Sequence, residues 1–302
     1  MNLTVSTTID EDLCTGCGLC VRVCPLGTIS MRNGKATVTG DQSLSCGHCV
    51  SACPVGAVEV KSLDPDMSTF SSFRVDPLWQ PHGQFDTGRL VGLMASRRSC
   101  RNFKDKSVDR AVLGDLVRVG ITAPSGGNNQ AWTFTILPSR PAVAGFVDHL
   151  AEFYEKLNRL AAKSSVRAVL SLVGKKDLDT YFHLYYRFIE LCLTEWRQKV
   201  RDRFFHGAHA AIVIGSKPNA LLPREDAMLA SQNMLLAAHS MGLGTCLVGL
   251  AVEAMHRDRT LQRCLGIPDQ ETVRSVIAIG YPDEKYRTPA GRKKADIRFF
   301  EG

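Results

Sequence analysis

The sequence has no run of apolar residues close to the ~18 that a membrane-spanning helix needs. Residues 1–12 are polar and acidic, and they contain neither the basic nor the apolar stretch of a secretory signal peptide. Also missing is any recognisable nucleic-acid-binding motif. These absences argue against a membrane protein, a secreted protein and a nucleic-acid binder, so we expect a cytoplasmic protein.

What the sequence does contain is an ordinary globular composition with unevenly distributed charge. Of its 302 residues, 44% are hydrophobic and 22% are charged, and this length predicts two domains. Residues 1–60 carry three Lys/Arg and five Asp/Glu, a net charge of −2, so the remainder carries +9 in a chain of net charge +7. We interpret this basic remainder as the part that binds an anionic cofactor.

Seven of the eleven cysteines lie between Cys14 and Cys53. An odd number without a secretory signal argues against a disulfide framework, because the cytosol keeps thiols reduced. The segment from Cys14 to Pro25 reads C-x2-C-x2-C-x3-C-P, a spacing in which three thiolates bind one [4Fe–4S] cluster and the fourth binds another. Zinc binding and purely structural thiols are the alternative interpretations.

Most of this pattern returns 29 residues later, where Cys46, Cys49 and Cys53-Pro54 repeat the spacing of Cys17, Cys20 and Cys24-Pro25. Between the two copies, Asn33-Gly34 predicts a hairpin turn. Two ligand runs with short strands resemble the bacterial two-cluster ferredoxin fold. We therefore predict a ferredoxin-like [4Fe–4S] domain over residues 1–62.

The resemblance to ferredoxins implies that the two clusters exchange one ligand. The first cluster then has a complete set, Cys14, Cys17, Cys20 and Cys53, whereas the second has Cys24, Cys46 and Cys49. Its fourth ligand should stand at position 43, which is Ser43, and a hydroxyl is a harder and poorer ligand than a thiolate. The second site therefore holds a cluster with serine or water at one iron, a three-iron cluster, or no cluster.

Residues 63–88 are rich in Ser, Asp, Pro and Gln and show no sustained periodicity. Pro65, Pro77 and Pro81 prevent a regular helix through most of this segment. We predict an extended linker.

From residue 89 onward, a series of segments resembles the nitroreductase family of flavoproteins, both in sequence and in order. They are Arg97-Arg98-Ser99-Cys100-Arg101-Asn102-Phe103, a predicted helix over 109–121, the polar loop of residues 123–132, a predicted strand over 133–137, Gln232-Asn233 on a helix, and Met241 to Cys246. The resemblance covers 89–302 apart from about 140–206. Residues 242–247 faintly echo a dinucleotide-binding motif, but the glycine pattern is incomplete and no strand precedes it.

The resemblance implies an α+β fold, in which a mostly antiparallel sheet is wrapped by helices, and an intertwined homodimer with FMN at the subunit interface. It also implies the cofactor contacts. Arg97, Arg98 and Ser99 would hold the phosphate, and Arg101 would lie by the N1–O2 edge of the ring. Arg292, together with Arg287 or Lys293, would be the late phosphate contact. Pro124, Ser125 and Gly126 would line the ring, Asn128 and Gln130 would bind the ribityl chain or ring edges, and Leu243, Gly244 and Thr245 would present a backbone N–H near N5.

Other segments have less specific interpretations. Residues 177–205 show helical spacing of apolar residues and predict one long amphipathic helix, whose aromatic stripe is more typical of core than of a substrate site. Cys100 and Cys246 would lie near the flavin as small buried residues. His206 and His209 are expected to have turn or packing roles.

No catalytic nucleophile or acid–base pair stands out, which suits a cofactor that performs the chemistry itself. We predict an FMN-dependent oxidoreductase whose iron–sulfur clusters pass electrons to FMN for reduction of a nitro, quinone or activated-alkene substrate. The donor is an external ferredoxin or NAD(P)H. The alternative is an electron carrier or redox sensor that serves a protein partner and has no small-molecule substrate.

Overall fold

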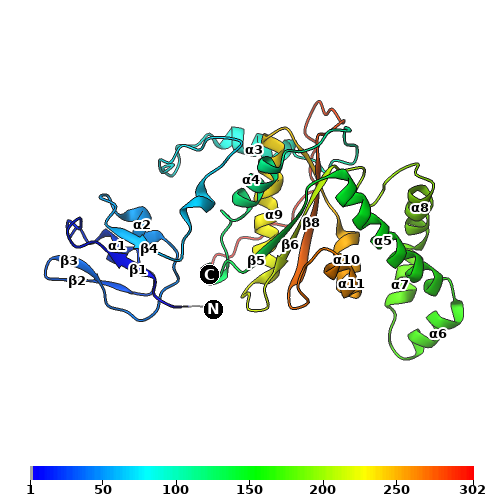
Figure 1. Cartoon of the computed structure of the whole chain (residues 1–302), viewed down its shortest axis with the longest axis horizontal. Helices are drawn as coiled ribbons and strands as arrows, with labels where there is room; N and C mark the ends of the chain where they lie inside the picture. The colour runs from blue at the N-terminus through cyan, green and yellow to red at the C-terminus, as the bar shows by residue number, and fades with distance from the viewer. Residues whose placement is uncertain (1–2) are drawn as a thin grey trace.

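The computed structural model describes residues 3–302, and a small cysteine-rich unit lies at one end of the molecule (Figure 1). This unit contains two antiparallel strand pairs and two short helices. The first strand pairs with the last, and the middle two form a hairpin. The elements are β1 (Thr7–Ile9), α1 (Leu19–Arg22), β2 (Ile29–Arg32), β3 (Lys35–Val38), α2 (His48–Ala52) and β4 (Val58–Val60).

The predicted hairpin turn is confirmed, with Asn33 and Gly34 at φ 49° and 77° between β2 and β3. Gly16 lies against this turn. A Cβ atom on Gly16 would stand 2.1 Å from the Gly34 carbonyl oxygen, so only glycine fits there. The loop that carries the first cysteines is therefore packed directly on the hairpin.

The connector of residues 63–88 contains one short 3-10 turn, η1 (Pro65–Ser68), and is otherwise irregular until α3 (Thr87–Ser96) begins. Asp64 caps η1 by accepting a hydrogen bond from the Asp66 backbone N–H. Further along, Ser71 and Ser72 bind the buried side chain of Asp115 in the large unit. The connector is thus held at a defined point although it lacks regular structure.

The large unit, which begins with α3, is built on one antiparallel sheet of order β5-β6-β8-β7. Its strands are β5 (Trp132–Leu137), β6 (Ala210–Ser216), β7 (Gly244–Leu247) and β8 (Thr272–Gly280). The α+β prediction is confirmed, and β5 confirms the strand expected over 133–137. Central β6 is buried along its whole length, which requires cover on both faces of the sheet.

Helices lie on both sides of the sheet and supply that cover (Figure 1). Alternate residues of β6 belong to different core clusters, because successive side chains of a strand face opposite sides of the sheet. Ile212 and Ile214 pack with α4 (Arg110–Gly120) and α9 (Pro223–Ser240). Ala211 and Val213 share the other core with α5 (Arg140–Ala161) and α10 (Gly249–Arg257), beside which lies α11 (Arg259–Arg263). The sheet is therefore sandwiched between two helical layers, as the resemblance implied.

The single long helix predicted over 177–205 is wrong. The structure has α6 (Ser164–Leu172), then α7 (Asp177–Leu184) and α8 (Tyr186–Arg197), separated by a break at Tyr185. The break lets both α7 and α8 pack against α5. Helix α8 cannot continue to 205 because the Asp202 carboxylate binds the backbone N–H groups of Phe204, Phe205 and Gly207 and so holds a turn.

Within residues 3–302, no helix combines the length and the apolar character that crossing a bilayer requires.

Candidate functional site

The cysteines of the small unit surround two separate cavities. Cys14, Cys17, Cys20 and Cys53 line the first, together with apolar residues such as Ile9 and Val58. Cys24, Cys46, Cys49 and Ser43 line the second. The structure thus brings each predicted ligand set together around one cavity. In each set, the first and last cysteines are more than twenty positions apart in the sequence.

Several thiols in these cavities are surrounded by hydrogen-bond donors. The backbone N–H groups of Ala36 and Gly16 lower the pKa of Cys14. Burial acts to raise the pKa of Cys24, but hydrogen bonds from Thr28, Leu26 and Ile29 together outweigh it and lower that pKa. The Ala57 N–H donates to the Cys53 sulfur at 3.2 Å. Donors aimed at sulfur suit thiolates that bind an iron–sulfur cluster.

In the part of the chain that the structure describes, no three His, Cys, Asp or Glu side chains converge on a point that would hold one metal ion. A zinc site needs such convergence, since all of its ligands bind one ion. A four-iron cluster instead binds each cysteine at a different iron. Ligands spread around a cavity therefore fit a cluster better than a single ion.

Ser43 lines the second cavity beside the three cysteines that are predicted to bind the second cluster. It is 7% exposed, and its hydroxyl accepts a hydrogen bond from the Ser45 N–H at 3.0 Å. Its own N–H donates to the Leu3 carbonyl at 2.8 Å. The side chain is thus fixed at the cavity wall by its local turn.

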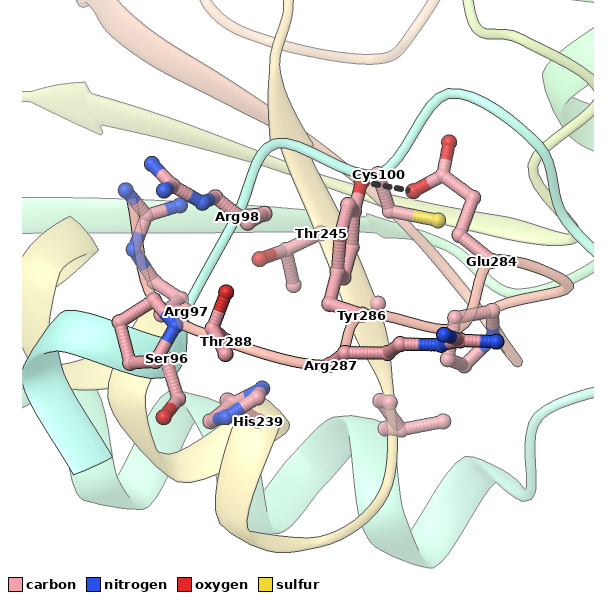
Figure 2. Close-up of a pocket in the computed structure, with 14 residues that line it drawn as sticks. Ser96, Arg97, Arg98, Cys100, His239, Thr245, Glu284, Tyr286, Arg287 and Thr288 are labelled. Carbon is pink, nitrogen blue, oxygen red and sulfur yellow. Dashed lines mark hydrogen bonds between the residues drawn. The ribbon is translucent and has the colours of Figure 1, made fainter. Parts of the chain in front are cut away.

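A third cavity, of about 280 Å³, lies in the large unit (Figure 2). Residues far apart in the sequence build it: the Cys100 N–H donates to the Thr245 carbonyl at 2.9 Å, and Ser99 bridges to Thr245 as in a parallel sheet. This approach needs Gly244, because a Cβ atom there would stand 2.8 Å from the Cys100 sulfur. The segment after α3 is therefore fixed alongside β7.

Positive charge dominates one side of this cavity. Figure 2 shows the guanidinium groups of Arg97 and Arg98 together, while the Arg287 side chain extends the other way. Among the described residues, none of these three arginines forms an ion pair with a carboxylate. Two neighbouring guanidinium groups with no anionic partner can donate charge-assisted hydrogen bonds to a phosphate group.

Glu284 supplies a negative group on the opposite wall. Its carboxylate accepts hydrogen bonds from the Arg101 N–H, the Asn102 amide and the Tyr286 hydroxyl, at 3.1, 2.8 and 2.8 Å. Burial would raise its pKa, but these donors outweigh burial and lower the pKa. Nearby, burial raises the pKa of the Cys100 thiol to about 11, so this thiol is neutral at physiological pH.

Only some of the predicted cofactor contacts meet at this cavity. Arg97, Arg98, Leu243, Gly244, Thr245 and Arg287 line it. Ser99 and Arg101 are next to lining residues in the chain but do not line it themselves. Arg292 lies in the exposed C-terminal segment, where it donates to the Ala290 and Gly291 carbonyls.

The loop that carries Pro124, Ser125, Gly126, Asn128 and Gln130 is not part of the cavity either. It includes the 3-10 turn η2 (Gly126–Asn128) and lies against α9, where the Gly126 N–H donates to Asp226 at 3.0 Å. The Asn128 side chain reaches the small unit instead. A single chain therefore does not bring this loop to the arginines.

Sequence reasoning missed other lining residues, among them His239, Glu284, Tyr286 and Thr288. His239 lies in the last turn of α9, just before the predicted Met241–Cys246 segment, and that proximity was an available signal. The segment that carries Glu284 and Tyr286 follows β8, whose end pairs with Gly244 of β7. This strand pairing, together with the contacts of Phe103 to Pro282 and of Asp283 to Asn102, places the segment at the cavity.

Comparison with known families agrees with both units. A model described as the nitroreductase family matches residues 94–281, which is more than half of the chain. The chain belongs to the nitroreductase family. Two models described as 4Fe-4S binding domains match residues 7–30 and 44–57. The protein is therefore an oxidoreductase of this family in which ferredoxin-type segments precede the nitroreductase domain.

Individual relatives are distant. A 4-nitrobenzoate reductase from Nocardioides is 27% identical over 210 residues, covering 64% of this chain and 81% of its own. An iodotyrosine deiodinase from Hydra vulgaris is 24% identical over 201 residues, which cover 67% of this chain and 68% of that protein. A nitroreductase structure with bound FMN from Bacteroides fragilis is 23% identical, covers 71% of this chain and 100% of its own, and has a TM-score of 0.49.

Proposed function

We propose that this protein is an FMN-dependent oxidoreductase whose iron–sulfur clusters pass electrons to FMN for reduction of a nitro, quinone or activated-alkene substrate. One observation carries the proposal: a single chain holds two cysteine-lined cavities and one arginine-lined cavity. Bound FMN would supply the conversion between single electrons and hydride. The proposed division is a ferredoxin-like domain over 1–62, a linker over 63–88 and a flavin domain over 89–302.

The protein's own residues have specific roles in this proposal. Arg97 and Arg98 bind the cofactor phosphate through charge-assisted hydrogen bonds, because no carboxylate of the described residues competes for them. Gly244 and Thr245 present backbone groups to the cofactor from the start of β7. The neutral Cys100 thiol fills space beside them and carries no charge.

The protein would work as a homodimer. Pro124, Ser125, Gly126 and Gln130 lie away from the arginine-lined cavity of their own chain, so we propose that a second copy supplies this loop to complete the cofactor site. The similarity to FMN-bound family members supports FMN as the cofactor. NAD(P)H or an external ferredoxin is the proposed donor.

The test begins with anaerobic protein reconstituted with iron, sulfide and FMN, then reduced with a measured amount of dithionite. On addition of a nitroaromatic or a quinone, we expect rapid, saturable reoxidation that free FMN at the same concentration does not reproduce. If the reduced protein ignores these acceptors but reduces an added redox protein, it is an electron carrier. If no flavin is retained, the proposal is wrong.

A matched pair of variants tests the phosphate site. Arg97→Gln should weaken FMN binding by about 10- to 100-fold, the value of one charge-assisted hydrogen bond. Arg89→Gln is the control, because Arg89 is exposed on α3 and makes no described side-chain hydrogen bond or ion pair. Equal FMN affinity in the two variants would remove Arg97 from the site.

A further inference from the structure

The Asn128 side chain joins the large unit to the small unit. Its Nδ2 donates to the Leu44 carbonyl at 3.1 Å and to the Ser45 carbonyl at 3.0 Å. Its Oδ1 accepts a hydrogen bond from Gln130 Nε2 at 3.0 Å. Because both ends of the amide have partners, its orientation is determined: the donor end faces the small unit.

The two accepting carbonyls belong to the second cysteine-lined cavity. Leu44 and Ser45 line that cavity between Ser43 and Cys46. In contrast, no residue that lines the first cavity makes a hydrogen bond to residues 89–302 within the described part of the chain. The large unit therefore meets the small unit at the wall of the second cavity.

Both sides of this contact have unusual backbone conformations. Ser45 and Asn128 have φ values of 50° and 51°, and Gln130 has 46°. Non-glycine residues pay about 1–2 kcal/mol for this left-handed region, with asparagine among those that tolerate it best. Such conformations persist where the surrounding contacts determine them, and here the contact consists of hydrogen bonds between the two loops.

A second attachment holds the connector to the large unit. The backbone N–H groups of Ser71 and Ser72 donate to the Asp115 carboxylate of α4, at 2.9 and 2.6 Å. This attachment fixes the connector a few residues after the small unit ends.

We propose that Asn128 is a docking residue. It holds the loop of Leu44 and Ser45 against the large unit, so that electrons leave the small unit from the second cysteine-lined cavity. This inference rests on the proposed function, and it assigns Asn128 to docking rather than to flavin contact. An external one-electron donor supplies the electrons. Two of these electrons, together with one proton from solvent, make up the hydride that the flavin delivers to the substrate.

The test uses the full-length holoprotein and two substitutions. Asn128→Asp keeps the size of the side chain and its tolerance of the left-handed region, but it replaces the donor with an anion facing two carbonyls. Asn128→Gly keeps the backbone conformation and removes the amide. The control is Asn233→Asp, which makes the same charge change on α9, where the amide donates to the Thr122 hydroxyl.

Limited proteolysis of the connector and small-angle X-ray scattering measure undocking. Stopped-flow spectra after dithionite reduction measure electron transfer. In both Asn128 variants we expect the undocked fraction to rise about tenfold, the effect of losing such hydrogen bonds. Flavin reduction by the clusters should slow in parallel with undocking. The control should match the unmodified protein in all three measurements.

Other outcomes overturn the inference in distinguishable ways. Unchanged proteolysis, scattering and electron transfer in both variants would show that Asn128 does not dock the units. Weaker FMN binding with unchanged proteolysis would make Asn128 a flavin contact and leave the proposed function intact. Failure of the unmodified protein to bind FMN would refute the proposed function. Proteolysis and scattering would still show whether Asn128 docks the two units.

Discussion

The Asp115 carboxylate accepts two hydrogen bonds from Ser72, one from the backbone N–H and one from the hydroxyl, both at 2.6 Å. The Ser71 N–H and the Arg118 guanidinium bind the same carboxylate at 2.9 and 3.2 Å. Asp115 is fully buried. A buried carboxylate is tolerated only when its oxygens are paired, so the position of the connector and the ionisation of Asp115 depend on each other.

Asp115→Asn should destabilise the large unit by about 3 kcal/mol, because it leaves Arg118 without its partner and places amide hydrogens against backbone donors. Urea unfolding followed by circular dichroism measures the change. Asp41→Asn is the control, since Asp41 is exposed and its side chain makes no hydrogen bond or ion pair that the structure describes. A loss no larger than that of the control would show that the contact contributes little.

The same carboxylate predicts a pH dependence. Burial acts to raise the pKa of Asp115, but the hydrogen bonds from Ser72 and Ser71 and the charge of Arg118 outweigh it and lower the pKa below its usual 3.8. A lowered folded-state pKa adds stability above the unfolded-state pKa, and this stability is lost as pH falls through the folded-state value. The stability gap between the unmodified protein and Asp115→Asn should therefore narrow below about pH 4. A constant gap down to the acid transition contradicts the assignment.

Much of the fold could be predicted because the relevant signals are local. Helix α4 and strand β5 follow from apolar periodicity, and the β2–β3 turn follows from Asn33-Gly34. The failure over 177–205 has a tertiary cause. Apolar spacing is helical on both sides of Tyr185, but the break there and the turn built by Asp202 depend on packing against α5 and on side-chain capture of backbone N–H groups.

The site divides in the same way. Arg97, Arg98 and Thr245 could be predicted from segments that resemble the family, and the structure gathers them around one cavity. Glu284 could not, because its carboxylate is positioned by the Arg101 N–H and the Asn102 amide, about 180 positions earlier in the chain. The reach of Asn128 to Leu44 and Ser45 joins two units whose relative placement no local pattern encodes.

Gly244→Ala should impair the arginine-lined cavity. The new methyl group would stand 2.8 Å from Cβ and Sγ of Cys100 and 3.2 Å from Pro282 Cβ, so the Ser99–Thr245 contact must open. We expect FMN affinity to fall at least about tenfold, as overpacking costs ~1–3 kcal/mol. Fluorescence titration with FMN measures it. Gly249→Ala is the control, since a Cβ atom there meets nothing within 4 Å, and similar affinities in both variants would argue against a cofactor beside Gly244.

Gly16→Ala should disrupt the first cysteine-lined cavity. Its φ of 71° strains any other residue, and its Cβ atom would overlap the Gly34 carbonyl oxygen at 2.1 Å. Gly34→Ala separates the two effects, because Gly34 also has a positive φ, of 77°, but open space around its Cβ position. We expect Gly34→Ala to cost only the ~1–2 kcal/mol of backbone strain. Gly16→Ala should in addition lose iron and visible absorbance, and equal iron content in the two variants would refute the steric argument.

Ser43→Cys should complete the second ligand set. Ser43 already lines the cavity with Cys24, Cys46 and Cys49, so the thiolate replaces a hydroxyl at the same wall. If the serine leaves this site with a three-iron cluster or no cluster, iron per chain should rise to about eight, that of two [4Fe–4S] clusters. The measurement is iron and sulfide analysis after anaerobic reconstitution, with electron paramagnetic resonance of the reduced protein. Ser51→Cys on α2 is the control, because Ser51 lines neither cavity.

If the unmodified protein already holds about eight irons and Ser43→Cys changes only the resonance spectrum, serine or water ligates the fourth iron. If both variants stay near four irons, the second cavity holds no cluster, and the route of electrons through it is wrong.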